Sequence, residues 1–220
     1  MVEFWDEVVV AGKLSTAELL TAAQLEVNQD GVEIPVPHLV ALQDRATQEV
    51  FDAAARVLAS EDSRARELGA RVLRELGPGD EAGRRPFSSE AVPLLTGRLS
   101  EEHGPRVLGW IISALGYNAA RESLDEVLPF AEHPHWRVRF HVAAALPALV
   151  DPDQIQPRAA DALMALCRDD YAETRYYALY ALLEEVAGVD QDELAHAITA
   201  LREDPDEQIR AMARARHVDA

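Results

Sequence analysis

The sequence predicts an all-α fold, a helical solenoid of about five helical pairs behind an N-terminal cap. The main observation is a recurring phrase: an acidic or proline-containing turn, then an arginine, then an alanine-rich apolar run. Its arginines are Arg66, Arg139, Arg175 and Arg210, of which the last three are 36 and 35 residues apart. A second observation is that no segment alternates polar and apolar residues over the length of a strand. Both point to repeated pairs of helices.

Residues 1–46 are predicted to form a cap of about two helices. Ser15 or Thr16 can cap the first of them, Glu18 supports its first turn, and the polar turn at 28–31 ends it. Two prolines then break the chain before the second helix. Such a cap is expected because the first repeat of a solenoid would otherwise leave its apolar face in water.

Apolar residues at helical spacing predict the five pairs within residues 47–220, which we expect to form one continuous array. The predicted helices are 48–59 with 63–76, 90–100 with 105–116, 121–132 with 135–149, 156–168 with 172–187, and 191–203 with 206–217. A cluster of turn-forming residues at 77–86 predicts a long loop after the first pair.

The recurring phrase also predicts how neighbouring repeats are joined. An acidic residue just before the second helix of a pair can cap the exposed backbone donors of that helix. The arginine that follows can reach carbonyls or carboxylates in the turn of a neighbouring repeat. The sequence therefore predicts a structural ladder of arginines along the array.

Charge limits the choice of partners. The 220 residues include 39 acidic and 21 basic ones, for a formal net charge of −18. Nucleic acid and anionic membrane surfaces are disfavoured, because both carry negative charge, whereas a basic protein or peptide is attracted. One local exception is a group of arginines between residues 64 and 85, which lies among acidic residues. The other explanation of the negative charge is that it keeps a long exposed surface soluble.

The N-terminus and the cysteine usage both favour a cytoplasmic location. The first seven residues carry acids where a secretory signal needs basic residues, and the apolar run 8–11 is too short to span a bilayer. Cys167 is the single cysteine, which fits a reducing compartment. Its place in an apolar helical run predicts a buried packing residue rather than a reactive thiol.

The phrases around Val138-Arg139, the run 143–146 and the segment 204–210 resemble the bacterial HEAT-repeat proteins similar to phycobilisome lyases. The resemblance covers about residues 47–217, and it implies a right-handed α–α superhelix whose second helices line a concave groove. The segment 48–77, followed by residues 85–87, looks like a group of actinobacterial HEAT proteins. The residues that carry the resemblance pack and cap helices, so it implies a fold rather than an activity.

No catalytic residue, metal or cofactor is predicted. The di-iron enzymes among HEAT-type proteins have His-Glu dipeptides, and this sequence has none. His133, His135 and His141 lack the spacing that places ligands on one helix face. The acidic pairs of the chain are expected in turns, where they cap helices, and the sequence has no phosphate-binding loop and no Cys-x-x-Cys motif.

Aromatic residues on the second helices provide the candidate partner-binding site. Phe140 follows Arg139 as Tyr176 follows Arg175, and Tyr180 shares a helix face with Tyr176. The predicted site comprises Trp136, Phe140, Glu173, Tyr176, Tyr180 and Glu184. Tyr177 and Trp110 are instead expected to pack between repeats.

These residues predict a non-enzymatic interaction scaffold that holds a protein or peptide, one of basic character, in its concave groove, because tyrosine and tryptophan dominate binding at interfaces. The alternative is an enzyme or accessory lyase that binds a small hydrophobic ligand in the same groove. The sequence leaves the oligomeric state open.

Overall fold

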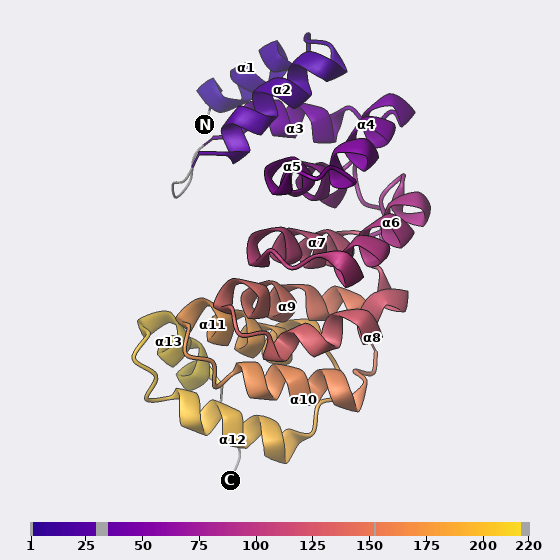
Figure 1. The fold of residues 1–220 in the computed structure, drawn as a ribbon. Coiled ribbons are helices and arrows are strands. Elements are labelled where there is room, and N and C mark those ends of the chain that lie inside the picture. Colours follow the sequence, from indigo (N-terminus) through magenta and orange to yellow (C-terminus); the bar gives the residue numbers. More distant parts are fainter. Residues whose placement is uncertain (1, 30–34, 152, 217–220) are drawn as a thin grey trace. The chain divides into compact units, whose positions relative to one another are not determined.

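The computed structural model describes residues 2–29, 35–151 and 153–216, and within these ranges the chain is helical and contains no strand. The all-α class predicted from the sequence is confirmed. The helices form two compact units, residues 1–119 and 120–220, and each is described by itself. Figure 1 follows the succession of helices in each unit.

The first unit begins with a cap of three helices. They are α1 (Val2–Ala11), α2 (Thr16–Val27) and α3 (Pro37–Asp44). Ser15 is the N-cap of α2: its backbone N–H donates to the Glu18 carboxylate at 2.8 Å, and its hydroxyl accepts the Glu18 N–H at 3.3 Å. The reciprocal cap confirms Ser15 over Thr16. The prediction of two helices omitted α1, and residues 30 and 31 of the predicted turn lie outside the described residues.

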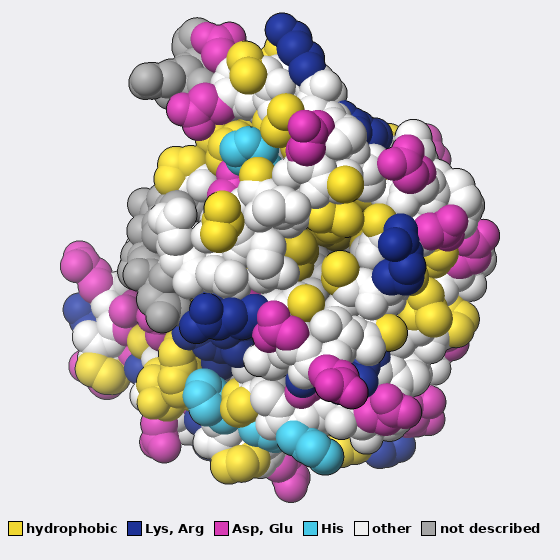
Figure 2. All heavy atoms as spheres, turned by 45° about the horizontal axis from the view of Figure 1, so that its top comes forward, with side chains coloured by type: hydrophobic (Ala, Val, Ile, Leu, Met, Phe, Trp, Pro, Cys, Tyr) yellow, Lys and Arg dark blue, Asp and Glu magenta, His cyan; other side chains and the backbone are white. Residues whose placement is uncertain are grey.

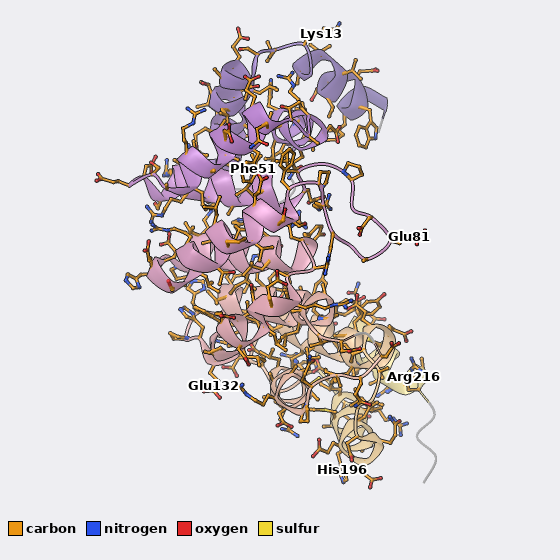
Figure 3. The ribbon with its side chains drawn as sticks, turned by 90° about the vertical axis from the view of Figure 1, so that its right-hand side faces the viewer. Lys13, Phe51, Glu81, Glu132, His196 and Arg216 are labelled. Atoms are coloured by element: carbon orange, nitrogen blue, oxygen red, sulfur yellow. The ribbon has the colours of Figure 1, made fainter. Side chains whose placement is uncertain are left out.

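Two helical pairs complete the first unit. They are α4 (Gln48–Leu58) with α5 (Ser63–Arg74) and α6 (Ser88–Glu101) with α7 (Pro105–Tyr117). The loop between the pairs stands out from the helices with Glu81 at its tip (Figure 3). Asp80 holds this loop together, because its carboxylate accepts the backbone N–H groups of Ala82 and Arg84 at 2.9 and 2.8 Å.

Three further pairs make up the second unit. The elements are η1 (Arg121–Ser123), α8 (Leu124–Val127) and η2 (Leu128–Glu132) with α9 (Trp136–Leu149), α10 (Pro157–Leu166) with α11 (Ala172–Tyr180) and η3 (Ala181–Glu185), and α12 (Gln191–Leu201) with α13 (Glu207–Ala215). The five predicted pairs are therefore present. Residue 217, the predicted end of the last helix, lies outside the described residues.

Two predicted helices differ in their internal geometry. The segment predicted as a helix over 121–132 consists of a 3₁₀ turn, one α-helical turn and a second 3₁₀ segment. Pro129, which has no N–H to continue the α-helical hydrogen bonds, lies at the start of the second 3₁₀ segment. The helix predicted over 172–187 changes at Ala181 into one π-helical turn, in which the Val186 N–H donates to the Ala181 carbonyl at 3.1 Å. Such turns displace the side chains that follow them.

The predicted arginine ladder is confirmed for Arg66, Arg139 and Arg175. Arg175, in the fourth position of α11, donates to both carboxylate oxygens of Asp204 at 2.8 Å and to the backbone carbonyl of Asp169 at 2.9 Å. Arg139 of α9 repeats this arrangement with Asp169 at 3.0 Å and with the carbonyl of His133 at 2.9 Å. Each of these guanidiniums thus joins the turn before its own helix to the corresponding turn of the next repeat.

The first unit contains the same arrangement. Arg66 of α5 donates to Glu102 at 2.6 Å and to the carbonyl of Glu61 at 2.7 Å. In the second unit, Arg210 of α13 donates to carbonyls of its own turn, at 2.6 and 2.7 Å, rather than to the turn of a neighbouring repeat. In α7 the equivalent fourth position is occupied by Leu108, which is buried. The ladder therefore follows the repeat pattern and is interrupted where the sequence replaces the arginine.

Glu102 is expected to make the first unit sensitive to acid. Burial by itself would raise the pKa of Glu102, but hydrogen bonds from Arg66 and from the N–H groups of Gly104 and His103 outweigh burial and lower the pKa to about 2. The folded pKa is below the unfolded value of about 4.3. The carboxylate therefore contributes stability above pH 4.3, and this contribution is lost as the pH falls toward 2.

The test is urea unfolding of the wild type and of Glu102→Gln between pH 7 and pH 2.5. At pH 7 the variant should be less stable by about 3 kcal/mol, and the difference should shrink by up to about 1.4 kcal/mol per pH unit below pH 4. Glu101→Gln is the matched control, because the Glu101 side chain is 71% exposed. A difference between wild type and Glu102→Gln that does not change with pH would contradict the prediction.

Candidate interaction site

The candidate site lies on the second helices of the second unit. Helix α11 packs against α9 on one side and against α13 on the other. Arg139 and Arg175 occupy the fourth position of their helices, so Phe140 and Tyr176, which follow them, take equivalent places on neighbouring helices. The ladder thus sets the register in which the aromatic residues meet.

Six aromatic side chains, which we call the aromatic cluster, gather on α9, on α11 and at the start of α11. They are Trp136, Phe140, Tyr171, Tyr176, Tyr177 and Tyr180. The Phe140 ring meets the Tyr177 ring edge-on at 5.3 Å between centroids, and Tyr177 meets Tyr176 at 5.5 Å. The Tyr176 and Tyr180 rings are parallel, with centroids 6.3 Å apart. These contacts connect four rings into one continuous set.

The other two rings form a stacked pair between the two helices. Trp136, the first residue of α9, stacks on Tyr171, the N-cap residue of α11, with 4.8 Å between ring centroids. The Arg137 guanidinium lies 5.2 Å from the Trp136 ring centroid on the same turn. Aromatic stacking at this distance fixes the orientation of both rings.

Much of the aromatic cluster is exposed. Tyr171 is 42% exposed and Tyr177 and Tyr180 are each 39% exposed, while Trp136, Phe140 and Tyr176 are half-buried. Of the four aromatic residues that the sequence predicted for the site, Phe140, Tyr176 and Tyr180 are connected through Tyr177, whereas Trp136 stacks on Tyr171. The structure also adds Tyr171 and Tyr177, so that four of the five tyrosines of the chain lie here.

The prediction for Tyr177 is wrong in part. Its ring contacts Phe140 of the preceding pair, as expected of a residue between repeats, but it remains exposed at the surface. The reason is that Ala178 and Leu179 fill the buried positions of α11, which leaves Tyr177 at the edge of the packed face. The run of two adjacent tyrosines was the sequence signal that could have identified it.

Acidic residues border part of the aromatic cluster. Glu173 lies exposed in the first turn of α11, and a cavity of about 310 Å³ is lined by Glu173, Tyr176, Tyr177 and residues of the α13 turn, including Asp206. Figure 2 shows acidic side chains spread over the face drawn there, with basic side chains in smaller groups. Glu173 and Asp206 thus place negative charge beside Tyr176 and Tyr177.

Glu184 differs from Glu173 in having a cationic partner. It lies on the π-helical turn η3, and its carboxylate accepts a hydrogen bond from the Arg216 guanidinium at 2.6 Å. Arg216 also donates to the Leu183 carbonyl at 2.7 Å. Of the two predicted site acids, Glu173 thus contributes more uncompensated negative charge than Glu184.

A larger cavity of about 490 Å³ lies between η3 and α12. Its lining includes Leu182, Leu183, Leu194 and Ile198, with Arg216 and Asp192 among the polar residues. Its residues are separate from the aromatic cluster. The second unit therefore presents both an exposed aromatic surface and a cavity with apolar side chains.

The histidines considered as metal ligands have structural contacts. The ring of His133 accepts the backbone N–H of His135 at 3.0 Å, and the ring of His135 accepts the N–H of Arg137 at 3.2 Å and so caps α9. His141 is buried. In the described part of the chain, no three His, Cys, Asp or Glu side chains gather as they would around a metal ion.

Cys167 occupies the packing position predicted for it. It is 2% exposed, and burial raises the pKa of its thiol to about 12, so the reactive thiolate is scarce at neutral pH. For the described helices, none combines the length and the apolar character needed to cross a membrane.

The fold and the ladder define a protein of helical repeats, and residues 104–183 match the family model of HEAT repeats. The fold is thus that of a HEAT-like helical solenoid, as the sequence indicated. No curated protein matches the sequence significantly.

Solved structures show the same fold. An Escherichia coli protein, YibA, superposes with a TM-score of 0.74 at 14% identity, over 95% of this chain and 72% of that one. The archaeal HEAT-like repeats protein from Thermococcus onnurineus NA1 gives a TM-score of 0.52 at 14% identity, covering 91% and 78%. A chain from the complex of CpcE and CpcF of phycocyanin lyase from Nostoc sp. PCC7120 gives 0.50 at 18% identity, covering 97% and 88%. At these identities the likeness concerns the fold alone.

Proposed function

We propose that this chain is a non-enzymatic interaction scaffold whose aromatic cluster binds a peptide segment of basic character. The observation that carries the proposal is the gathering of six aromatic rings on adjacent helices, three of them about two-fifths exposed. Large exposed aromatic surfaces are uncommon on proteins without a partner, and tyrosine and tryptophan contribute most to binding at interfaces. HEAT-like folds, one of which is found in a complex of two proteins, are consistent with this role.

The chemistry of the site supports a partner with lysine or arginine. Tyrosine faces attract cations, and Glu173 and Asp206 beside Tyr176 and Tyr177 add negative charge. The net charge of −18 would attract a basic segment over longer distances. The exposure of the rings favours an extended segment lying across α9 and α11 over a ligand enclosed in a closed pocket.

The test uses a library of fluorescent peptides that combine arginine or lysine with aromatic or aliphatic residues. Peptides that bind the wild type should bind Tyr176→Ala/Tyr180→Ala at least about tenfold more weakly, because each lost ring contributes on the order of 1 kcal/mol. Raising the salt should also weaken binding, since the Debye length falls from about 10 Å at 0.1 M to about 3 Å at 1 M.

Trp5→Ala is the control, because Trp5 is an exposed aromatic residue of the cap. It should bind the peptides as the wild type does. Peptides that bind the tyrosine double variant and the wild type equally would contradict the proposed function, provided that circular dichroism shows the variant to be folded.

The second candidate function is binding of a small hydrophobic ligand, as in an enzyme or accessory lyase. The cavity of about 490 Å³ beside η3 favours it, because its volume suits a small molecule and its lining includes leucine and isoleucine side chains. Replacing Ala195, which lines this cavity, with tryptophan should then abolish binding of an apolar fluorescent probe and leave peptide binding unchanged. Probe binding that survives this substitution would exclude the cavity as the ligand site.

A further inference from the structure

A second surface, with different chemistry, lies on the second helices of the first unit. We call it the arginine face; it consists of Arg71 and Arg74 of α5, Arg85 of the loop before α6, and Trp110 and Tyr117 of α7. The Arg71 guanidinium lies 4.5 Å from the Trp110 ring centroid, and that of Arg74 lies 3.5 Å from the Tyr117 ring centroid. Arg85 lies 5.7 Å from the same tyrosine ring. Stacking on rings holds a guanidinium flat and leaves its N–H edge available to acceptors.

The hydrogen bonds of the arginine face hold the guanidiniums in place. Arg74 donates to the Ser113 hydroxyl at 2.9 Å, which joins α5 to α7. Arg85 donates to the Tyr117 carbonyl at 3.2 Å and to the Gly77 carbonyl, so its contacts there are with neutral groups. The side chains are thus positioned before any ligand arrives, which lowers the entropy cost of binding.

Positive charge on this face exceeds the negative charge that touches it among the described residues. The Glu67 carboxylate forms ion pairs with Arg106, at 2.5 Å, and with Arg71, at 3.5 Å. The Glu75 carboxylate forms an ion pair with Arg74. Burial lowers the pKa of Arg71, and the nearby Arg106 and Arg74 lower it further against the effect of Glu67. Guanidiniums kept this close in a half-buried place repel one another, and an anionic ligand would relieve that repulsion.

One residue of the arginine face has an equivalent in the aromatic cluster. Arg71 follows the ladder residue Arg66 by five residues, as Tyr180 follows Arg175 by five. At this one position of the second helices, the residue is therefore cationic in the first unit and aromatic in the second.

We propose that the arginine face binds an acidic peptide segment, whose Asp and Glu carboxylates accept hydrogen bonds from Arg71, Arg74 and Arg85. Arginine matches a carboxylate with two parallel hydrogen bonds, and Tyr117, which is 43% exposed, offers an apolar contact beside them. A short acidic segment suits the face better than duplex DNA. DNA carries roughly one charge per 1.7 Å, so many of its phosphates would lie beyond the few arginines of the face. The rest of the chain, whose net charge is −18, would repel those phosphates. The inference is independent of the function proposed for the aromatic cluster.

The test measures binding of a fluorescein-labelled peptide of alternating Glu and Gly residues by fluorescence polarisation. The peptide should bind the full chain, and a peptide with Gln in place of Glu should not. Arg71→Gln/Arg85→Gln should weaken binding by about tenfold or more, because the variant loses charge-assisted hydrogen bonds to the carboxylates of the peptide. Arg56→Gln/Arg84→Gln removes the same number of charges outside the face and should leave affinity within about twofold.

A second variant tests whether weaker binding results from loss of the guanidiniums or from loss of folding. Arg71→Lys/Arg85→Lys retains the charges and loses the planar guanidinium, so it should bind the peptide more weakly than the wild type while unfolding at a similar temperature. The proposal is overturned if the acidic peptide does not bind, or if both Arg71/Arg85 variants bind as tightly as the wild type. Duplex DNA could instead bind more tightly than the peptide, with this binding lost in the same variants. That result would overturn the proposal in favour of a nucleic-acid site.

Discussion

Asp204→Ala is expected to destabilise the second unit by about 3–5 kcal/mol, the typical cost of breaking a buried ion pair by removing one partner. Arg175 is 8% exposed and Asp204 is 6% exposed, and two hydrogen bonds of 2.8 Å join them. Without Asp204, the Arg175 guanidinium would keep its charge in a place that water barely reaches. The free energy of unfolding from urea titrations measures the effect.

The chain contains a matched control for this prediction. Arg158 and Asp125 form another Arg–Asp pair of the second unit at 2.9 Å, but their side chains are 70% and 79% exposed. Asp125→Ala should therefore cost less than about 1 kcal/mol. Equal losses in the two variants would show that burial does not determine the strength of the ladder.

A double variant separates the pair from the charge left behind. Arg175→Met/Asp204→Leu removes both charges together, so it should be more stable than Asp204→Ala. Asp204 also accepts the Asp206 N–H at 2.8 Å, and the double variant loses that bond as well. The double variant is therefore expected to regain only part of the stability that Asp204→Ala loses.

Gly69→Ala is expected to destabilise the first unit by about 1–3 kcal/mol, the usual cost of overpacking a core. Gly69 lies where α5 crosses α4, and a Cβ atom there would lie 2.6 Å from the Leu58 nitrogen and 2.8 Å from the Ala54 carbonyl oxygen. Both contacts are with backbone, so the helices must separate. Alanine favours a helix over glycine by about 1 kcal/mol, which offsets part of the cost.

Gly97→Ala is the control with the opposite sign. Gly97 lies within α6, and a Cβ atom there meets nothing within 4 Å. The substitution should stabilise the chain by about 0.5–1 kcal/mol through helix propensity alone. Thermal unfolding of the two variants compares them directly, and a Gly69→Ala variant that is stabilised like Gly97→Ala would disprove the close approach of α4 and α5.

The helical pairs and the arginine ladder could be predicted from the sequence because both depend on local pattern. Apolar spacing placed the five pairs, and the acid before each ladder arginine indicated where the carboxylate partners of Arg139 and Arg175 lie. The broken segment at 121–132 was harder to predict, because its apolar residues have helical spacing while Pro129 interrupts the backbone hydrogen bonds. The prediction of one continuous array from residue 47 stays a prediction beside the two compact units.

The candidate site could be predicted only in part. Repeat register placed Phe140 and Tyr176 at equivalent positions, because a helical period assigns residues to faces without knowledge of the partner helix. Tertiary packing decided that Tyr177 stays exposed against Phe140, that Tyr171 stacks on Trp136, and that Arg216 pairs with Glu184. Exposure and pairing depend on which side chains neighbouring helices bring to the same place, and residues far apart in the chain meet there only once the helices have packed.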